Sequence, residues 1–398
     1  MDITIHPGRL CGTIQAIPSK SQAHRLLICA AFSDSETVLI CPQTNQDIEA
    51  TADCLRALGA SIRRTNDGYI VNPVSHFPQK AVLNCRESGS TLRFMLPIIG
   101  ALGVDATFQL AGRLSQRPLS PLWEEMIRMG CTLTHPTPDS IRCTGQLKAG
   151  KYTIDGGVSS QFITGLLFAM ALIPGQCHLT VTGTLESKPY IDITRQALTI
   201  FGVATSENLV TGSFPAQSPK KVSVEGDWSN GAFFLAAKAL GSHINIEGLD
   251  LNSAQGDRAI ASILDTMTNQ VILSASDIPD LVPILSVVAA AKHGAVFTQI
   301  QRLRLKESDR VASVISMLEA LGIHAEATND TLTVYPGKFC GGIVDTFNDH
   351  RIAMSAAIAA TVASGPVTIL NAHCVAKSYP AFWDEYRRLG GNYEQYIR

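Results

Sequence analysis

The 398-residue chain lacks the features that mark membrane, disulfide-rich and nucleic-acid-binding proteins. It has no apolar run long enough to span a membrane, and its start, MDITIHPGRL, has no apolar signal-peptide region. Its ten cysteines show no C-x-x-C spacing and so predict reduced core thiols, with neither a disulfide framework nor a zinc site. The formal net charge is only -2. We therefore expect a soluble, cytoplasmic protein whose cationic sites are local.

Several catalytic motifs are absent as well. The sequence has no Walker A loop, no G-x-G-x-x-G after a strand, no H-E-x-x-H and no G-x-S-x-G. These absences argue against a P-loop nucleotide site, a Rossmann cofactor, zinc peptidase chemistry and serine hydrolase chemistry. None of these motifs therefore indicates a metal or cofactor site.

The chain has the length and composition of a two-domain protein. It is 45% hydrophobic and only 17% charged, which is enough apolar material for two large cores. One repeated pattern is a helix that ends in a hydrophobic residue and a glycine, followed by strand-like alternation. It occurs at Cys54, Glu125, Ala197, Ser316 and Tyr386, and a sixth copy at Ile263 lacks the glycine. Each glycine is predicted to end its helix in the left-handed conformation.

A second repeat is a polar or glycine-rich entry that leads into an unusually apolar helix. The entries lie near Ser19, Ser88, Ser159, Ser229, Pro279 and Asp349, with similar spacings except for a shorter one between Ser229 and Pro279. A helix that is apolar on all sides must be buried on all sides. We therefore expect an α/β fold with strands outside and apolar helices inside.

Six such helices are too many for one core, and the polar stretch Ser206 to Ser223 divides them three and three. The sequence predicts two domains, each a threefold arrangement. If the helices in a domain are parallel, their N-termini face one way. Pro97 and Pro283 predict a kink or a late helix start, and Gly165 predicts close packing or a weak helix.

The first apolar helix carries charges of an unexpected sign at its start. Ser19 is a predicted N-cap, while Lys20 and Arg25 lie in the first two turns, where the helix dipole favours anions instead. Either a bound anion is shared by these groups, or the two side chains are solvated. Other entries also hold donors suited to phosphate or carboxylate, among them Ser88, Gly89, Ser90, Arg93, Ser159, Ser160, Gln161, Ser229 and Arg351.

The stretch RLRLKESDR, from Arg302 to Arg310, packs charged residues most densely. One interpretation is an exposed strand that runs into a capped helix, with Arg310 solvated. The other is that Glu307, surrounded by cations, is an acid/base residue that takes up a proton when bound anions offset those cations. His24 and His350 are predicted to be structural rather than acid/base residues.

Nine stretches in order resemble the 5-enolpyruvylshikimate-3-phosphate synthase family of enolpyruvyl transferases. They are PSKSQAHR, ESGSTLR, QRP, SSQF, SKPYIDIT, IPD, RLKESDR, NDHRIAM and AKSYP, from residue 18 to 380. The resemblance implies two domains, each an inside-out α/β barrel of three units with buried parallel helices, around an active-site cleft. The expected domains are residues 1–18 with 225–398, and residues 19–224.

The family transfers the enolpyruvyl group of phosphoenolpyruvate to the 5-hydroxyl of shikimate 3-phosphate. By matching position, the residues expected to bind shikimate 3-phosphate are Lys20, Ser21, Arg25, Ser159, Ser160, Gln161, Ser187, Asp280 and Lys306. Those expected to bind phosphoenolpyruvate are Lys20, Gly89, Arg117, Gln161, Arg310, Arg351 and Lys377. The resemblance implies that Asp280 is the base on the hydroxyl, that Glu307 exchanges the proton at the methylene carbon, and that Lys20 assists electrostatically.

The resemblance also implies small-molecule partners only, no metal or nucleotide, domain closure on the substrates and a monomer. This chain departs from the usual pattern at Glu87, Ser88 and Ser90, and at Arg302, where asparagine is frequent. Arg302 puts one contact to the shikimate phosphate in doubt. Two alternatives stay open: an enolpyruvyl transferase acting on UDP-N-acetylglucosamine, with Cys131 or Cys143 as its loop cysteine, and a relative that binds anions without catalysis.

Overall fold

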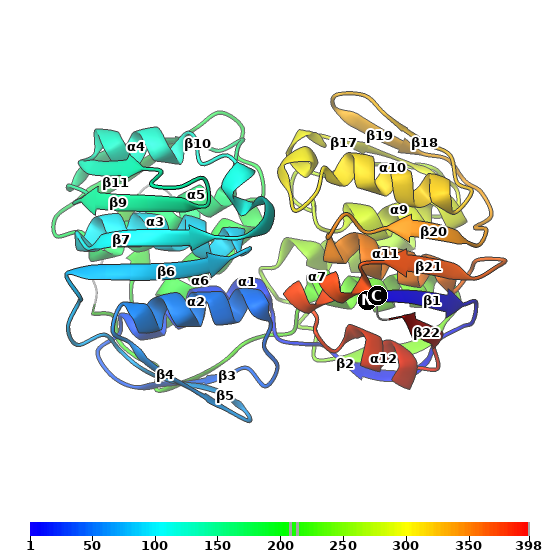
Figure 1. Cartoon of the computed structure of the whole chain (residues 1–398), viewed down its shortest axis with the longest axis horizontal. Helices are drawn as coiled ribbons and strands as arrows, with labels where there is room; N and C mark the ends of the chain where they lie inside the picture. The colour runs from blue at the N-terminus through cyan, green and yellow to red at the C-terminus, as the bar shows by residue number, and fades with distance from the viewer. Residues whose placement is uncertain (207–208, 212–214, 397–398) are drawn as a thin grey trace. The chain divides into compact units, whose positions relative to one another are not determined.

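The computed structural model describes residues 1–206, 209–211 and 215–396. The chain folds into two compact units: unit 1 is Met1–Ile17 with Gly226–Arg398, and unit 2 is Pro18–Glu225. Each division lies one residue from the position expected from the sequence. Part of the polar stretch Ser206 to Ser223, residues 207–208 and 212–214, lies outside the described residues. Both units combine helices with mixed sheets, so the expected α/β class is confirmed (Figure 1).

Unit 2 contains three four-stranded sheets with the same pattern. In each, one parallel pair is followed by two antiparallel pairings. The first sheet has the strand order β14 (Lys221–Ser223), β3 (Thr37–Ile40), β5 (Gly68–Asn72), β4 (Ser61–Thr65). The second has the order β6 (Lys80–Arg86), β7 (Asp105–Leu110), β9 (Ser140–Gly145), β8 (Cys131–Thr134). The third has the order β10 (Gly150–Asp155), β11 (Cys177–Thr182), β13 (Leu209–Thr211), β12 (Ala204–Thr205).

The apolar helices of unit 2 are buried, as their composition predicts. They are α1 (Lys20–Ala31), α3 (Gly89–Leu102) and α5 (Ser160–Leu172). The helices α2 (Gln46–Ala57), α4 (Leu122–Arg128) and α6 (Lys188–Ile200) are amphipathic and only half-buried, and a 3-10 helix, η1, spans Gly112–Gln116. Figure 1 shows β6, β7 and β9 side by side, with α3 and α5 behind them.

Gly165 of α5 is a point of close packing, which is one of the two alternatives that the sequence left open, the other being a weak helix. A Cβ atom there would lie 2.2 Å from the Arg93 carbonyl oxygen and 3.0 Å from Cγ of Pro97 in α3. Pro97 has no N–H to bond that carbonyl, which lies four residues earlier in the helix. The glycine therefore lets α5 approach α3 at a turn that proline has opened.

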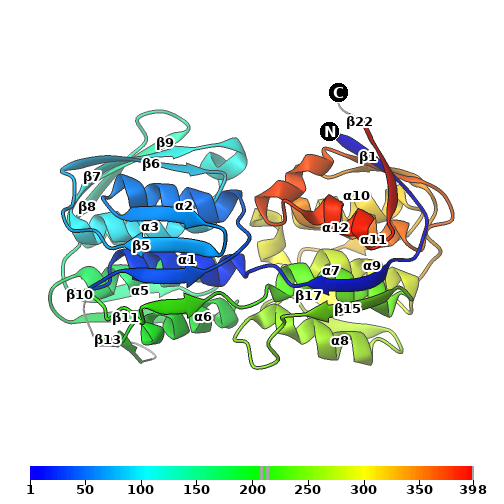
Figure 2. The same ribbon diagram turned by 90° about the horizontal axis from the view of Figure 1, so that it is seen from below.

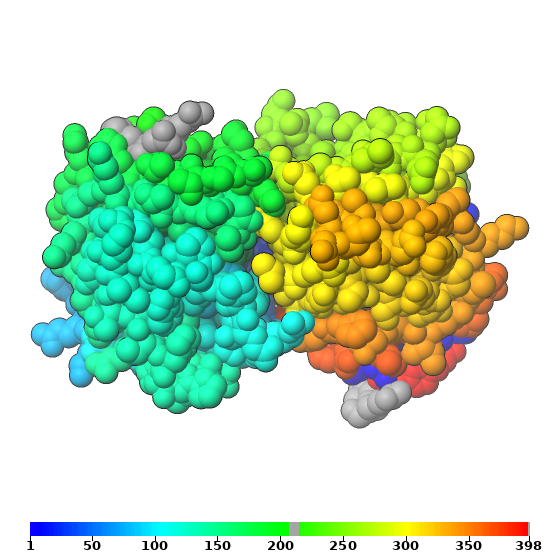
Figure 3. Space-filling model, turned by 90° about the horizontal axis from the view of Figure 1, so that it is seen from above, coloured from blue at the N-terminus to red at the C-terminus, as the bar shows by residue number. Residues whose placement is uncertain are grey.

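Unit 1 contains two complete sheets of the same pattern. Their strands are β16 (Val271–Ser274), β17 (Ala295–Thr298), β19 (Thr331–Val334) and β18 (Ala325–Ala327), and β20 (Gly342–Asp345), β21 (Val367–Leu370), β1 (Asp2–His6) and β22 (Asn392–Tyr396). The two chain ends lie close together because β1 pairs with β22 (Figure 2). The yellow and orange segments that include β17, β18 and β19 form much of the face of unit 1 seen in Figure 3.

The third sheet of unit 1 is a parallel pair only, β2 (Cys11–Gln15) with β15 (His243–Glu247). This part of the chain has the short repeat interval and the helix copy that lacks glycine. Its helices are the 3-10 helix η2 (Gly256–Ala259) and α8 (Ile260–Thr266), after which the chain enters β16 directly. The short interval therefore reflects the absence, within the described residues, of the antiparallel strand pair that every other sheet has.

The apolar helices of unit 1 are α7 (Trp228–Ala239), α9 (Val282–Ala291) and α11 (His350–Ala360), and all three are largely buried. Pro283 lies in the first turn of α9, so the expected late helix start is confirmed there. Residues at the C-terminal ends of all three helices, including Leu240, Lys292 and Val362, line one hollow of about 410 Å³. The remaining helices are α10 (Arg310–Ala320), α12 (Phe382–Arg388), and the 3-10 helices η3 (Gln301–Leu305) and η4 (Ala372–Lys377).

The predicted helix ends are confirmed at the glycines. Gly59, Gly130, Gly202, Gly322 and Gly390 all have positive φ, between 73° and 116°. Each follows a helix and precedes a strand, which is the left-handed stop that the repeat predicts. Of the ten cysteines, only Cys11 and Cys340 are exposed. Within the described part of the chain, no helix is long and apolar enough to cross a membrane.

Candidate functional site

The polar entries of α3 and α5 meet in unit 2. Ser88 and Ser159, which the sequence places at the entries of these helices, are their N-caps. Gln161 joins them, because its Nε2 donates to Ser90 Oγ at 2.9 Å while its Oε1 accepts from Arg93 Nη1 at 3.0 Å. The N-termini of two buried helices, with their partial positive charge, therefore lie beside an arginine.

Gly89 lies at the closest point of this arrangement. A Cβ atom on Gly89 would lie 2.6 Å from Nη1 of both Arg93 and Arg117. Only a residue without a side chain leaves the two guanidinium groups in these positions. The helix entry, its amide groups and two arginines therefore converge on one small space.

Lys20 and Arg25 of α1 are linked to α3 and α5. Arg25 Nη2 donates to Thr164 Oγ1 of α5 at 3.3 Å, and the carbonyl of Asp47, the partner of Lys20, accepts from Thr91 Oγ1 of α3 at 3.5 Å. Lys20 Nζ forms an ion pair with Asp47 Oδ2 at 2.9 Å. Arg25 is 2% exposed; its Nε donates to Thr194 Oγ1 at 2.7 Å and its Nη2 to the Tyr190 carbonyl at 3.0 Å. Burial lowers the pKa of Arg25 to about 9. The interpretation of Arg25 as a solvated side chain at the helix end is therefore wrong, and Ser19 is the N-cap as predicted.

We call Lys20, Arg25, Gly89, Arg93, Arg117 and Gln161 the Gly89 cluster. Ser21 lies in the first turn of α1, and its carbonyl accepts from Arg25 Nη1 at 2.6 Å. Ser160 is buried in the first turn of α5, and Ser187 is buried at the start of α6 in the left-handed conformation. The cluster is rich in cations and backbone donors, which suits a ligand with several negative charges.

A second cluster, in unit 1, surrounds the buried side chain of Arg310. Its Nε lies 3.0 Å from Asp349 Oδ2, its Nη1 lies 2.8 Å from Asp280 Oδ1, and its Nη2 lies 2.6 Å from Glu307 Oε2. Arg310 is 1% exposed, so the interpretation in which its side chain is solvated is wrong. One guanidinium thus holds three carboxylates, which include both predicted acid/base residues.

Asp280 has two further cationic neighbours. Arg351 Nη2 contacts its Oδ2 at 3.0 Å, and Lys306 Nζ lies 3.9 Å from its Oδ1. Burial alone would raise the pKa of Asp280, but Arg351, Lys306 and Arg310 hold it well below its usual range. Burial also lowers the pKa of Lys306 to about 8. We call Asp280, Lys306, Glu307, Arg310, Asp349 and Arg351 the Arg310 cluster.

The local fold around Arg310 differs from the exposed strand that was one interpretation of RLRLKESDR. The segment Gln301–Leu305 is the 3-10 helix η3, and Asp309 caps α10 at Ala312 N. Asp349 caps α11 by accepting from Arg351 N at 2.9 Å while it also binds Arg310. The starts of two helices are therefore tied together. Lys377, at the end of η4, donates to the Asn348 carbonyl at 3.3 Å.

The sequence did not identify every residue of these clusters as part of a site. Asp47 was not singled out, and Arg93 was noted only as a donor at a helix entry. The signal for Arg93 was its spacing of four residues from Gly89, which places both on one face of α3.

His24 is fully buried and its Nδ1 bonds Thr51 Oγ1 at 2.7 Å, while burial lowers its pKa to about 3. It is therefore a neutral core residue.

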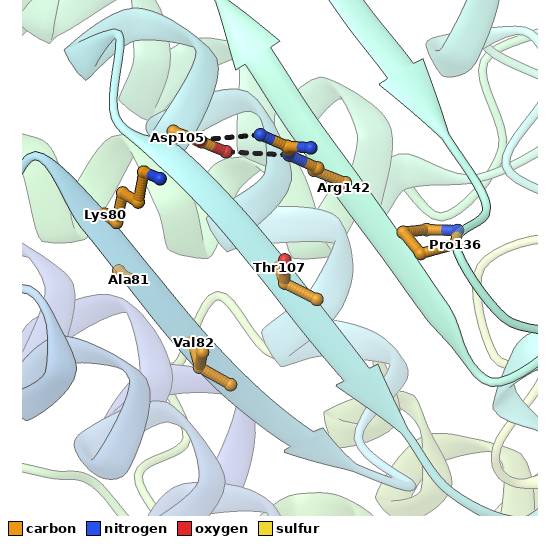
Figure 4. A pocket seen from close by; sticks show the side chains of 7 residues that line it. All are labelled: Lys80, Ala81, Val82, Asp105, Thr107, Pro136 and Arg142. Carbon is orange, nitrogen blue, oxygen red and sulfur yellow. Dashed lines mark hydrogen bonds and ion pairs between the residues drawn. The ribbon is translucent and has the colours of Figure 1, made fainter.

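A solvent-facing hollow of about 480 Å³ lies elsewhere in unit 2, on the sheet of β6, β7 and β9 (Figure 4). Its lining includes Lys80, Asp105 and Arg142. Arg142 donates to both carboxylate oxygens of Asp105 at 2.9 Å. With its arginine already paired and largely exposed, this hollow lacks the buried, convergent cations of the Gly89 cluster.

Comparison with known proteins identifies the family. The family model described as EPSP synthase (3-phosphoshikimate 1-carboxyvinyltransferase) matches residues 5–277 and 273–386. The 3-phosphoshikimate 1-carboxyvinyltransferase of Clostridium kluyveri is 37% identical over 425 residues, covering 99% of this chain and 98% of that protein. The Clostridium perfringens enzyme of the same name is 38% identical over 419 residues, covering 98% of each chain.

Solved structures agree with this match. An EPSP synthase from Acinetobacter baumannii has a TM-score of 0.80 and 25% identity, with 99% of each chain covered. The enolpyruvyl transferase NikO from Streptomyces tendae has a TM-score of 0.76 at 20% identity, covering 99% of this chain and 98% of that one, and shows a shared fold. With a family model that spans nearly the whole chain and relatives above one-third identity, the chain belongs to the EPSP synthase family.

Proposed function

We infer that this chain transfers the enolpyruvyl group of phosphoenolpyruvate to the 5-hydroxyl of shikimate 3-phosphate and releases phosphate, as a step of the shikimate pathway. Its membership of the family supports this inference. Within the structure, the observation that carries it is Arg310, whose guanidinium contacts Asp280 at 2.8 Å and Glu307 at 2.6 Å. The reaction needs one carboxylate for the hydroxyl and another for the methylene carbon, both close to a cation that holds the anionic substrate.

The binding roles carried over from the family fit the two clusters. We propose that shikimate 3-phosphate is bound by Lys20, Ser21, Arg25, Ser159, Ser160, Gln161, Ser187, Asp280 and Lys306. Phosphoenolpyruvate would be bound by Lys20, Gly89, Arg117, Gln161, Arg310, Arg351 and Lys377. Each list draws on both clusters, so the proposal requires both units to act on one pair of substrates. Hydrogen bonds to charged groups contribute about 1.5 to 3 kcal/mol each, so side chains supply most of the affinity.

In the proposed first step, the 5-hydroxyl oxygen forms a bond to C2 of phosphoenolpyruvate. Asp280 accepts the hydroxyl proton, and Glu307 donates a proton to the methylene carbon, which becomes a methyl group. In the second step Glu307 removes a proton from that methyl group while the bond from C2 to the phosphate oxygen breaks. The double bond re-forms and phosphate leaves, with Lys20 stabilising the developing charge.

The ion pairs of the Arg310 cluster suggest how the ligands switch on this chemistry. Without substrate, Arg310 and Arg351 hold the Asp280 carboxylate and keep it a weak base. We propose that phosphoenolpyruvate anions take over these two guanidinium groups. Asp280 and Glu307 then lose part of their cationic surroundings and bind protons more readily. Closure around the substrates would also exclude water.

We further propose that each unit is an inside-out α/β barrel, with three parallel buried helices and the sheets outside. In unit 1, the C-terminal ends of α7, α9 and α11 line one hollow, as parallel helices would. The starts of α9 and α11 are close, because Asp280 and Arg351 are paired. In unit 2, the bond between Ser90 and Gln161 brings the starts of α3 and α5 together.

The alternative acceptor UDP-N-acetylglucosamine is less well supported. Its candidate loop cysteines, Cys131 and Cys143, lie in β8 and β9 and are 4% and 0% exposed. Neither thiol lies in an exposed loop. The binding-only alternative is disfavoured because Asp280 and Glu307 share one buried cation, which is an arrangement that anion binding alone does not need.

The deciding experiment is phosphate release from phosphoenolpyruvate by the purified chain. We expect release only when shikimate 3-phosphate is present. Release that depends on UDP-N-acetylglucosamine would identify the other acceptor, and no release with either would support binding without turnover. The monomeric state and the cytoplasmic location stay predictions; light scattering on a sizing column checks the first.

A further inference from the structure

Asp257 is a buried carboxyl group that the proposed reaction does not use. It lies in the 3-10 helix η2 of unit 1 and is 2% exposed. Its Oδ2 accepts a short hydrogen bond from Ser229 Oγ, in the first turn of α7. Its Oδ1 is buried and has no hydrogen-bond partner among the described residues. A buried oxygen without a partner is costly, so its retention requires an explanation.

The surrounding chain fixes Asp257 in place. Gln255, two residues earlier, accepts from Trp228 N at 3.0 Å and donates to the Gly226 carbonyl at 2.8 Å. Ser253 Oγ in turn accepts from Gln255 N at 3.0 Å. The loop before η2 is thus bonded to the start of α7 at several points. Asp257 cannot rotate into solvent without breaking this arrangement.

The charged groups that act electrostatically on Asp257 come from three elements. Asp227 is the N-cap of α7, Asp280 precedes α9, and Arg351 lies in the first turn of α11. Asp280 is itself surrounded by Lys306, Arg310 and Glu307. Burial raises the pKa of Asp257 to about 7, and the negative charge of Asp280 acts in the same direction, while Arg351 opposes the rise.

We propose that Asp257 is a positioning residue that controls how strongly Arg351 binds phosphoenolpyruvate. When Asp257 carries a proton, the positive charge of Arg351 is available to Asp280 and to the substrate anion. When Asp257 is ionised, it attracts Arg351 and competes with the substrate. One oxygen of the buried carboxyl has no hydrogen-bond partner among the described residues and the other is held by the neutral Ser229 hydroxyl, so the group can switch between these states. The proposal rests on the proposed role of Arg351.

The direction of the pH effect follows from this competition. Asp257 is mostly protonated at pH 6 and mostly ionised at pH 9. The KM for phosphoenolpyruvate should therefore rise with pH in the unchanged protein. In Asp257→Asn the side chain keeps nearly the same shape and stays neutral, so the variant should match the protonated form at every pH.

The test is the KM for phosphoenolpyruvate of both proteins at several pH values from 6 to 9. We expect the two values to agree at pH 6 and the unchanged protein to have a roughly fivefold higher KM at pH 9, the size of one added charge at moderate distance. Titration of the substrate affects both proteins equally, so it cancels in the ratio of the KM of the unchanged protein to the KM of the variant. Asp265→Asn, at an exposed position of α8, is the control. Its KM should equal that of the unchanged protein at every pH from 6 to 9.

Ser229→Ala provides a second variant if Asp257→Asn does not fold. Loss of the Ser229 hydrogen bond removes an interaction that lowers the pKa of Asp257, so the rise in KM should move to higher pH. An unchanged pH profile in both variants would overturn the proposal. So would a KM that is raised equally at all pH values in Asp257→Asn. If the unchanged protein shows no turnover with shikimate 3-phosphate, it is the proposed function that fails.

Discussion

Gly89 is the residue whose replacement should separate binding from stability most clearly. An added methyl group would lie 2.6 Å from Nη1 of Arg93 and Arg117, so these groups must move. Both are ends of flexible side chains, and the fold can absorb their shift. We expect Gly89→Ala to raise the KM for phosphoenolpyruvate at least tenfold, a loss of about 1.4 kcal/mol, with little change in melting temperature.

Gly8→Ala is the matched control, because a Cβ atom there would meet nothing within 4 Å. Steady-state kinetics give the KM for phosphoenolpyruvate of both variants, and thermal unfolding gives their melting temperatures. An unchanged KM in Gly89→Ala would separate Gly89 from the phosphoenolpyruvate site.

Glu307 should matter for turnover and not for binding. Glu307→Gln removes the exchangeable proton while it preserves the size of the side chain and one acceptor for Arg310. We expect kcat to fall by about 100-fold or more, the usual range for loss of an acid/base group. Titration calorimetry should show that both substrates still bind.

Glu319→Gln, at an exposed position of α10, the helix that follows Glu307, serves as the control and should keep full activity. Near-normal turnover of Glu307→Gln would rule out the proton exchange assigned to Glu307.

The sequence predicted the residue types of both clusters but not their pairing. Lys20 and Arg25 were recognisable because cations at a helix start oppose the dipole. Their partners Asp47 and Thr194 lie 27 and 169 residues further along the chain, and no local pattern connects them. Arg310 was ambiguous for the same reason, since besides the local Glu307 it is paired with Asp280 and Asp349, which are 30 and 39 residues away in the chain.

At the scale of elements, the contact between α3 and α5 is the most sensitive part of unit 2. A Cβ atom at Gly165 would lie 2.2 Å from the Arg93 carbonyl oxygen, which is backbone and cannot move alone. Replacing glycine by alanine normally favours a helix by about 1 kcal/mol. Here the clash outweighs this gain, and we expect Gly165→Ala to lower the free energy of unfolding by about 1 to 3 kcal/mol.

Urea unfolding measures this difference. Gly231→Ala is the matched control in α7, since its added methyl group would meet only the side chain of Leu249, at 3.1 Å or more. Equal stability of the two variants would show that α5 can move away from α3 at no cost.

Elements were easier to predict than sheets. Helix caps and left-handed glycines are local, so the Ser19 cap and the glycine stops followed from neighbouring residues. Sheet order was not predicted, because strand partners are far apart in the chain: β3, near the start of unit 2, pairs with β14, near its end. The short repeat interval did indicate an unusual unit, and the structure shows that it corresponds to the two-stranded sheet of β2 and β15.

At the scale of the whole molecule, the proposed function requires both clusters to engage the same ligands. We expect a phosphoenolpyruvate analogue and shikimate 3-phosphate together to decrease the radius of gyration measured by small-angle scattering, because each proposed ligand binds groups of both clusters and would draw the two units together. Either ligand alone is the control and should have a smaller effect. An unchanged radius with both ligands bound would argue against closure.

The pairing of β1 has a consequence for the order in which the protein folds. Ile3 lies opposite Ile369, and Asp2 opposite Tyr396, whereas unit 2 is the continuous segment Pro18–Glu225. During synthesis on the ribosome, the segment Met1–Ile17 emerges before unit 2, but β21 and β22, the partner strands of β1, emerge after it. Unit 2 can therefore fold while the segment before it is still extended, whereas unit 1 cannot be completed until β21 and β22 have been made.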